Sequence, residues 1–205
     1  MVTLFRFIYE LRTNKLLKVM WFQDKPRIRL IPLPNPPEDV RFSFLNTKFG
    51  RMIMGTVQAK KEVAICFLYF VVKSDDETQD EVQKRWPKSQ LRRDDDANQE
   101  LTDKLFGGEK ENVNEIPIAV LGTDFQKDVW TALIDLKSGQ SCTYSQLAER
   151  MDRPKAVRAV ASAVAKNEVA ILIPCHRIVS QNGCSKYHWG GALKQQLLDY
   201  EKSIK

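Results

Sequence analysis

The most informative stretch of this chain reads Asn167-Glu168-Val169-Ala170-Ile171-Leu172-Ile173-Pro174-Cys175-His176-Arg177. Its apolar run is rich in Val and Ile, and this predicts a short buried strand that ends at Pro174. A proline interrupts a strand and fixes φ for a turn. We therefore expect Cys175 and His176 to lie at the end of a rigid strand, and we take Cys175 as the centre of a candidate site.

The composition is that of a globular protein with one or two domains. The chain has 205 residues, of which 43% are hydrophobic, enough to bury a sizeable core. It contains no apolar run of about eighteen residues, so we expect no membrane span. The charges that interrupt the first residues make a poor secretory signal. Four cysteines, Cys66, Cys142, Cys175 and Cys184, do not resemble a disulfide framework. We expect an intracellular protein, nuclear in a eukaryote and cytoplasmic otherwise.

The net charge of +6 is unevenly distributed along the chain. Residues 118–205 carry 12 Lys and Arg against 8 Asp and Glu, whereas residues 43–117 carry 12 against 14. A basic segment beside an acidic one points to a polyanionic partner for the C-terminal part. A slightly basic surface without any partner accounts for the charge equally well.

The first half of the chain predicts a small β-sheet domain. Residues 1–41 end in a proline-rich connector, and we treat them as an N-terminal extension of unknown role. Turn signals separate the apolar runs of residues 42–117. The strands expected there are Phe42–Leu45, Arg51–Val57 and Glu62–Tyr69, and the helices are Asp80–Trp86 and Asn98–Phe106. A polar linker that begins at Gly107-Gly108 closes this domain.

The second half, residues 118–205, predicts a mainly helical domain and an α+β fold class overall. The expected helices run from Thr123 to Leu136 with a stop at Gly139, and over Tyr144–Met151, Lys155–Lys166 and Ala192–Ile204. The two middle helices are joined by a tight three-residue turn, which is the shape of a helix-turn-helix.

The predicted helix Lys155–Lys166 has an unusual surface. Val157, Val160 and Val164 form its apolar stripe, and the outer face is made of Ala and Ser with Arg158. Such a face allows close approach of another surface, either a nucleic-acid groove or a neighbouring part of the same protein.

Cys175 is either an inert buried thiol or a nucleophile. A nucleophile needs a base that removes its proton. His176 is adjacent, but neighbours on an extended backbone point to opposite sides, so the chain must turn after Pro174. Glu201 on the last helix is a candidate to orient the imidazole. A metal site built from Cys175, His176, Cys184 and His188 would lack the short ligand spacings of zinc sites, so we expect no metal.

Several blocks together resemble the O6-alkylguanine–DNA alkyltransferases, and the alkyltransferase half of the bacterial adaptive-response protein most of all. The matching blocks are Gly122–Gln126 with Val129-Trp130, Thr143–Ala148, Pro154–Val160, Asn167, Ile173–Arg177, Tyr187, Lys194, Leu197-Leu198 and Glu201. More loosely, residues 42–117 resemble the ribonuclease-H-like N-terminal domain of that family. The resemblance implies single-use DNA repair by a protein that needs no cofactor and acts as a monomer on alkylated duplex DNA.

The resemblance also implies roles for individual residues. Cys175 would take the alkyl group from guanine O6 as a thiolate, and His176, oriented by Glu201, would remove its proton through a water. Tyr144 would donate a proton to the leaving guanine and help to rotate the nucleotide, while Asn167 would brace the turn. The base pocket would be lined by Tyr187, His188, Val164 and Ile178. The DNA-binding residues would be Arg158, which fills the stack, with Lys155, Ala159, Ser162 and Tyr144.

The sequence also departs from the family pattern. The loop Gly183–Tyr187 is one residue shorter than usual, with Lys186 where a glycine commonly precedes the tyrosine, so the range of accepted alkyl groups stays open. Two other functions stay open as well. One is a module that binds alkylated DNA without transfer, and the other is a cysteine hydrolase that uses Cys175, His176 and Glu201.

Overall fold

A computed structural model describes residues 27–106, 115–180 and 186–204 of the chain. The described residues form a mixed fold of one large sheet, a small sheet and helices. The strands are β1 (Arg27–Pro32), β2 (Asp39–Thr47), β3 (Gly50–Ala59), β4 (Glu62–Phe70), β5 (Gln90–Arg93), β6 (Glu115–Val120), β7 (Cys142–Thr143) and β8 (Ile178–Val179). The helices are α2 (Asp75–Arg85), α3 (Gln99–Phe106), α4 (Asp124–Ile134), α5 (Tyr144–Arg150), α6 (Val157–Ala165) and α7 (Gly191–Ser203), with the 3₁₀ turns η1 (Pro154–Ala156) and η2 (Cys175–Arg177).

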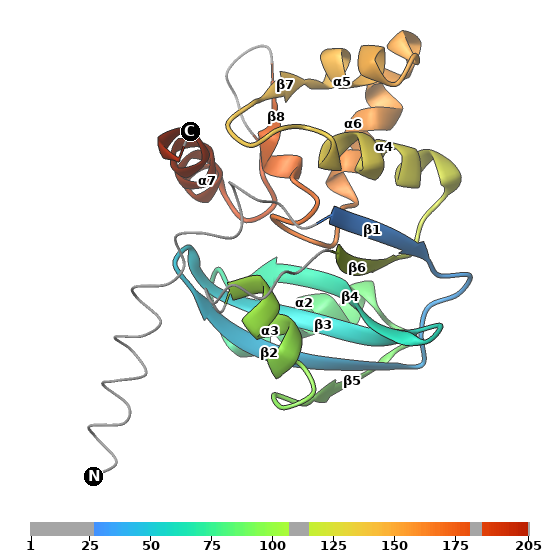
Figure 1. Ribbon diagram of the computed structural model, residues 1–205, viewed down its shortest axis with the longest axis vertical. Coiled ribbons are helices and arrows are strands. Elements are labelled where there is room, and N and C mark those ends of the chain that lie inside the picture. Colours follow the sequence, from blue (N-terminus) through green and yellow to red (C-terminus); the bar gives the residue numbers. More distant parts are fainter. Residues whose placement is uncertain (1–26, 107–114, 181–185, 205) are drawn as a thin grey trace.

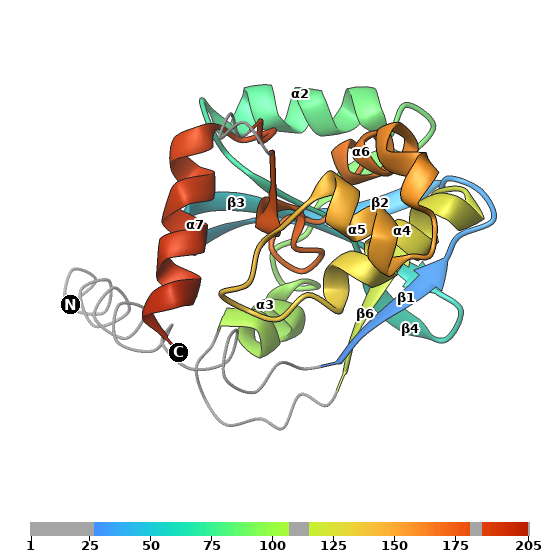
Figure 2. The ribbon, with the colours of Figure 1, turned by 90° about the horizontal axis from the view of Figure 1, so that it is seen from above.

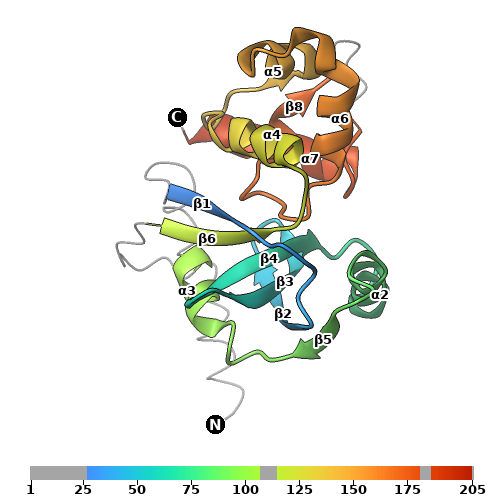
Figure 3. The same ribbon diagram turned by 90° about the vertical axis from the view of Figure 1, so that its right-hand side faces the viewer.

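The large sheet has six strands in the order β1-β6-β4-β3-β2-β5. The antiparallel run β2-β3-β4 forms its centre, and β1 and β5 pair in parallel with β6 and β2 at the edges. Figures 1 and 3 show α2 and α3 on opposite faces of this sheet. Because both faces are covered, β3 and β4 are buried over most of their length, and their sequences are almost continuously apolar.

Figures 1 and 3 show the helices α4 to α7 beyond the β1–β6 side of the sheet, and Figure 2 shows α7 apart from α4, α5 and α6 when they are seen from above. Local sequence fixes where two of them begin. Thr123 accepts from the backbone of Gln126 in a capping box at α4, and Thr143 and Gln146 make the same exchange at α5. The Trp130 indole donates to the Ala163 carbonyl at 3.0 Å and so fastens α4 to α6.

Most of the predicted elements are present in the structure. The three strands of the first half are confirmed as β2, β3 and β4, and the helix expected from Asn98 is α3. The four helices expected in the second half are α4 to α7, although α4 ends at Ile134 and the third begins as the 3₁₀ turn η1. The first helix is longer than predicted, because Ser74 accepts from the Glu77 N–H and caps α2 at Asp75.

The strand predicted over the apolar run before Pro174 is wrong. Residues 170–173 form a buried turn, and only Val169 makes a bridge, to Leu68 of β4. Ile171 has φ of 66°, a left-handed conformation that a β-branched residue rarely adopts. The Asn167 side chain accepts from the Val169 N–H at 2.9 Å and starts the turn. The apolar run therefore predicted burial correctly, but it did not determine the backbone conformation.

The segments at both predicted domain boundaries belong to the sheet. Residue 42 lies within β2 and residue 118 within β6, so each boundary cuts a strand. Within the extension 1–41, Arg27–Pro32 form the edge strand β1, which pairs with β6 over its whole length. The linker predicted from Gly107-Gly108 and most of the loop Gly183–Tyr187 lie outside the described residues. Among the residues described, no helix is long and apolar enough to cross a membrane.

Candidate functional site

The candidate nucleophile lies on the 3₁₀ turn that follows Pro174. The Cys175 N–H donates to the Ile173 carbonyl at 2.8 Å, and the Arg177 N–H donates to the Pro174 carbonyl at 3.0 Å. This tight turn replaces the extended backbone on which neighbouring side chains would point apart. Cys175 remains half-buried there, while the side chains of His176 and Arg177 are buried.

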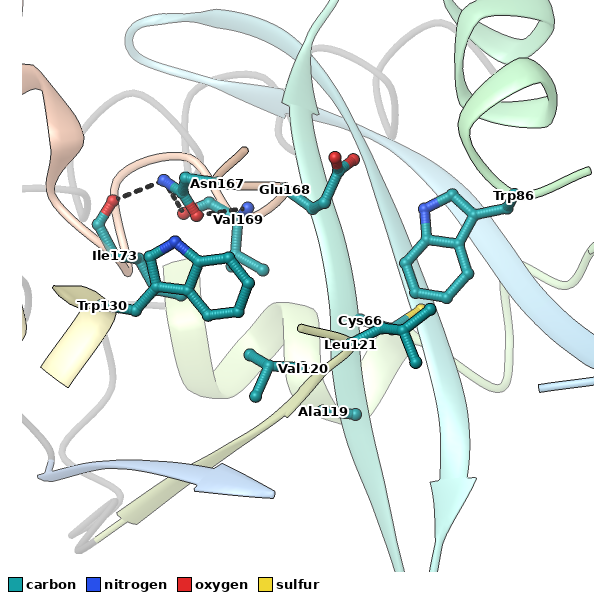
Figure 4. Close-up of a pocket in the computed structure, with 10 residues that line it drawn as sticks. All are labelled: Cys66, Trp86, Ala119, Val120, Leu121, Trp130, Asn167, Glu168, Val169 and Ile173. Atoms are coloured by element: carbon teal, nitrogen blue, oxygen red, sulfur yellow. Dashed lines mark hydrogen bonds between the residues drawn. The ribbon is translucent and has the colours of Figure 1, made fainter. Parts of the chain in front are cut away.

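Asn167 ties the whole turn together through one amide group. Its Nδ2 donates to the Ile173 carbonyl at 2.9 Å and to Cys175 Sγ at 3.1 Å, with a longer contact of 3.3 Å to the Val169 carbonyl. Figure 4 shows the Asn167 amide between the Val169 and Ile173 backbones, next to the Trp130 ring. A buried amide with this many partners holds the sulfur in one place.

Behind the turn, Glu201 of α7 accepts from three groups. His176 Nε2 lies 2.8 Å from Glu201 Oε1, the Arg177 guanidinium contacts both carboxylate oxygens at 2.6–3.0 Å, and the Gly139 N–H donates to Oε2 at 2.9 Å. Arg177 also donates to the Leu136 carbonyl at 2.6 Å. Glu201 is fully buried, so these donors compensate the charge that burial would otherwise disfavour.

This arrangement fixes the proton on the imidazole of His176. Burial raises the pKa of Glu201, but the hydrogen bonds from His176 and Arg177 outweigh it and bring the pKa to about 2. Burial lowers the pKa of His176, so the ring is neutral near pH 7. An ionised carboxylate only accepts, so the proton lies on Nε2 and leaves Nδ1 with a free lone pair. Nδ1 is buried and has no hydrogen-bond partner among the described residues. The residue that follows Cys175 therefore carries a neutral imidazole with one free nitrogen lone pair.

The thiol itself is uncharged in this surrounding. Burial raises the pKa of Cys175, and the Asn167 hydrogen bond and the charge of Lys194 oppose that rise without cancelling it. Lys194 is buried on the inner face of α7, and its ammonium donates to the Ile178 carbonyl. A thiolate at Cys175 therefore requires a proton acceptor, and Lys194 would stabilise it once formed.

Two tyrosines approach the sulfur from different segments. Burial raises the pKa of both Tyr144 and Tyr187, and charge on Cys175 raises each further, which reflects their closeness to it. The Tyr187 hydroxyl is buried without a hydrogen-bond partner in the described part of the chain. Tyr144 is the first residue of α5 and is half-buried. Both hydroxyls therefore interact electrostatically with the sulfur.

The other residues predicted for the pocket lie in different surroundings. Val164 and Ile178 are buried in the core, on α6 and β8. His188 is exposed, and its Nε2 lies 2.6 Å from Glu81 of α2. No contact with Cys175 is among the interactions of His188 in the described structure. The structure therefore pairs this histidine with α2 rather than with the sulfur.

The predicted DNA-binding residues share one exposed surface. Lys155, Arg158, Ala159 and Ser162 are all exposed along η1 and α6, whereas Val160 and Val164 face the core. The surface of α6 is thus made of small side chains flanked by basic ones, as the sequence predicted. In the residues the structure describes, no group of three or more His, Cys, Asp or Glu side chains could hold a metal ion. Cys184 lies outside the described residues.

Sequence reasoning missed several residues of the site. Arg177 was noted only as a neighbour of the Cys-His pair, and Gly139 only as a helix stop, yet both bind Glu201. The signal for a buried Lys194 and Glu201 was present in α7, because they share with Leu197 the spacing of one helical face. Nothing in the sequence indicated which backbone groups would meet that carboxylate.

Comparison with known proteins shows what this chain is similar to. Residues 124–203 match the family model described as 6-O-methylguanine DNA methyltransferase, DNA binding domain. The chain is 36% identical over 166 residues to the bifunctional transcriptional activator/DNA repair enzyme Ada of Escherichia coli (strain K12), which covers 79% of this chain and 45% of that protein. It is 41% identical over 124 residues to the inducible methylated-DNA–protein-cysteine methyltransferase of Bacillus subtilis (strain 168), covering 58% of this chain and 68% of that protein.

A solved structure shares the fold. The crystal structure of the O6-methylguanine methyltransferase of Mycobacterium tuberculosis superposes with a TM-score of 0.58 at 25% identity, covering 81% of this chain and 94% of that one. The chain spans 45% of the length of the Escherichia coli relative, whose remainder has no counterpart in the match. From the match with the Bacillus subtilis protein and the shared fold, the chain belongs to the methylated-DNA–protein-cysteine methyltransferase family.

Proposed function

We propose that this protein repairs duplex DNA by transferring a methyl or other alkyl group irreversibly from guanine O6 to Cys175. The observation that carries the proposal is that the hydrogen bonds Asn167–Cys175 and His176–Glu201–Arg177 hold the tight turn Cys175–Arg177 from two sides of the sequence. It supplies a fixed sulfur and a neutral base beside it. A nucleophile next to a base that a third group orients is the general arrangement of covalent catalysis.

The transfer balances without a cofactor. His176 Nδ1 takes the thiol proton of Cys175 through a bridging water, and the thiolate attacks the alkyl carbon. The sulfur–carbon bond forms as the carbon–O6 bond breaks, and its electron pair stays with the guanine. Tyr144 gives its hydroxyl proton to the departing base and regains one from solvent, while His176 releases to solvent the proton that it took from the thiol. The products are an S-alkyl cysteine and an unmodified guanine, so each molecule acts once.

The surface of α6 suits the DNA that this reaction needs. We propose that α5, its turn and α6 act as a helix-turn-helix that lays the small face around Ala159 and Ser162 in the minor groove. Lys155 would contact phosphate, and Arg158 would enter the stack as the damaged base rotates out. Extrusion costs a few kcal/mol, and an inserted side chain offsets part of it. The base would then lie against Tyr187, with Val164 and Ile178 behind the pocket.

Each half of the chain would then correspond to one domain of the family. The part of the chain built on the large sheet would correspond to a ribonuclease-H-like domain, and residues from 118 onward to the DNA-binding and catalytic domain. A monomer suffices for the reaction, since all the proposed groups come from one chain. Its place would be the compartment that holds DNA, the nucleus in a eukaryote or the cytoplasm otherwise.

Peptide mapping after exposure to a lesion tests the proposal. The protein is incubated with a duplex that carries one O6-methylguanine, and its peptides are analysed by mass spectrometry. A methyl group on the Cys175 peptide is expected in the wild type and in Cys66→Ser, whose sulfur is buried in the sheet, but not in Cys175→Ser. Binding of the duplex with the base left unchanged would instead favour a module that only recognises the damage.

A further inference from the structure

Helix α2, which belongs to the sheet layer, contacts two segments that flank the cysteine. Arg85 Nη1 donates to Glu168 Oε1 at 2.8 Å, and Glu81 Oε1 lies 2.6 Å from His188 Nε2. Glu81 and Arg85 are one helical turn apart, and their own charged groups are 3.8 Å from each other. The four side chains therefore form a continuous series of polar contacts from His188 to Glu168.

One end of this series of polar contacts reaches the turn that holds the sulfur. Glu168 follows Asn167 directly, and the Asn167 amide donates to Cys175 Sγ at 3.1 Å. The other carboxylate oxygen of Glu168 accepts from the Tyr69 hydroxyl, and the Glu168 carbonyl accepts from the Leu68 N–H at 2.9 Å. In Figure 4 the Glu168 side chain points toward Trp86, at the end of α2, while Asn167 lies on the Trp130 side. Glu168 is thus fastened on both its main chain and its side chain.

The other end reaches the segment that carries Tyr187. His188 follows Tyr187 and packs edge-on against Tyr69 and Trp189, with ring centroids 6.2 and 5.0 Å apart. Trp189 contacts Tyr187 in turn, at 5.2 Å. The guanidinium of Arg85 lies 5.8 Å from the Tyr69 ring, so the same arginine borders both segments.

We propose that Arg85 is a positioning residue for alkyl transfer. Through Glu168 it holds the turn between Asn167 and Cys175 in place, and with it the sulfur. The proposal rests on the function proposed above. The side chains of Arg85 and Glu168 are only one-third and one-quarter exposed, so water competes less for their hydrogen bond than for that of a fully exposed pair. A planar guanidinium that meets a carboxylate and a ring at once is geometrically specific, and a flexible ammonium reproduces it in part. Arg85 itself is remote from the reacting atoms and acts through Glu168 and Asn167.

Two variants at neighbouring residues distinguish a positioning role of Arg85 from a general effect of removing a charge from α2. Arg85→Gln removes the charge that faces Glu168, and Lys84→Gln removes a neighbouring charge that is exposed on the same last turn of α2. With saturating O6-methylguanine duplex, Arg85→Gln is expected to slow single-turnover methylation about three- to tenfold, the usual size of coupling through packed networks. Its dissociation constant for unmodified duplex should match that of Lys84→Gln. Arg85→Lys should recover part of the rate.

A second measurement needs neither DNA nor alkyl transfer. The rate at which iodoacetamide labels Cys175, followed against pH, reports the pKa of the thiol. Because the Asn167 hydrogen bond lowers that pKa, a displaced turn should move the profile of Arg85→Gln to higher pH and leave that of Lys84→Gln in place. Arg85→Gln should have a smaller effect on both readouts in a Glu168→Gln background than in the wild type, because the contact between the two side chains is already altered there.

The outcomes distinguish this proposal from the proposed function. If the wild type fails to methylate Cys175 while the labelling profile still shifts in Arg85→Gln, the repair function is refuted, and the effect of Arg85 on the turn that holds the sulfur stands. If the wild type methylates but Arg85→Gln equals Lys84→Gln in both rate and labelling profile, the positioning role is refuted. Equal losses of rate and of DNA affinity, with an unchanged profile, would also overturn it.

Discussion

Arg177 and Glu201 meet through a forked contact in which the guanidinium reaches both carboxylate oxygens at 2.6–3.0 Å, with both side chains almost fully buried. The same carboxylate also contacts His176, whose Nε2 lies 2.8 Å from Oε1. One acidic group on α7 thus fixes two consecutive residues of the turn that carries Cys175. The ion pair therefore stabilises the fold and also fixes the carboxylate that orients His176, the proposed base.

Replacement of this carboxylate should damage the fold as well as the chemistry. Glu201→Gln keeps the shape of the side chain but leaves the buried Arg177 charge without a counterion. Removing one partner of a buried pair costs about 3–5 kcal/mol, so we expect a loss of that size in the free energy of unfolding measured with urea. Asp199→Asn on the exposed side of α7 should change it by less than about 0.5 kcal/mol. Equal stabilities of the two variants would contradict the structural role of the pair.

The stability of the protein should fall as the solution is acidified. The folded-state pKa of Glu201 is about 2, below its ordinary 4.5, so its stabilising contribution is complete above pH 4.5 and is lost as pH falls toward 2. Burial lowers the pKa of His176 below 6.5, so acid also favours the unfolded state from about that pH downward. Urea unfolding at a series of pH values should show the decline in the wild type. In Glu201→Gln the part below pH 4.5 should be reduced, and an unchanged slope there would refute the assignment.

Loss of the Asn167 amide should loosen the cysteine turn. Asn167→Ala leaves the buried Val169 N–H without its acceptor and removes the hydrogen bonds to the Ile173 carbonyl and to the sulfur. An unsatisfied buried group costs about 1–3 kcal/mol, which urea unfolding would detect. Because that hydrogen bond lowers the pKa of Cys175, iodoacetamide labelling should also shift to higher pH. The exposed Asn46→Ala serves as the control, and a labelling profile like that of the control would contradict this reading.

The small side chains of α6 should matter for DNA and not for folding. Ala159→Leu adds bulk to an exposed position, so the free energy of unfolding should change by less than about 0.5 kcal/mol. If α6 enters a groove, the added side chain should weaken duplex binding by about tenfold, equivalent to about 1.4 kcal/mol. Ala192→Leu, the same change at an exposed position of α7, should leave the affinity unaltered. Equal affinities of the two variants would argue against α6 as the contact surface.

The sequence predicted burial and helices well, but not the conformation of the central turn. Periodic apolar residues and Thr caps located α4 and α5, because these signals are local. The run before Pro174 is Val- and Ile-rich and fully buried, yet it folds as a turn, since Asn167 supplies the hydrogen bonds that a neighbouring strand would otherwise provide. Local residue propensities do not show that a side chain will supply the hydrogen bonds that a neighbouring strand would otherwise make.

The sequence patterns did not predict contacts between segments that are distant along the chain. The edge strands β1 and β5 pair with β6 and β2, and each pairing joins segments separated by several other elements. His188 was expected at the base pocket, whereas the structure gives it Glu81 of α2 as partner. In the site itself, the Glu201–His176 contact was anticipated, but the bond from Gly139 depends on how the loop after α4 meets α7.

The most direct test of the account is the stoichiometry of methyl transfer in a single encounter. Protein and a duplex with one O6-methylguanine are mixed in equal amounts, and the intact protein, its Cys175 peptide and the released DNA are analysed together. The account predicts one methyl group per protein molecule, located on Cys175, with one restored guanine for each, and no further reaction when fresh duplex is added. Repeated turnover, or restored guanine with Cys175 unmodified, would contradict it.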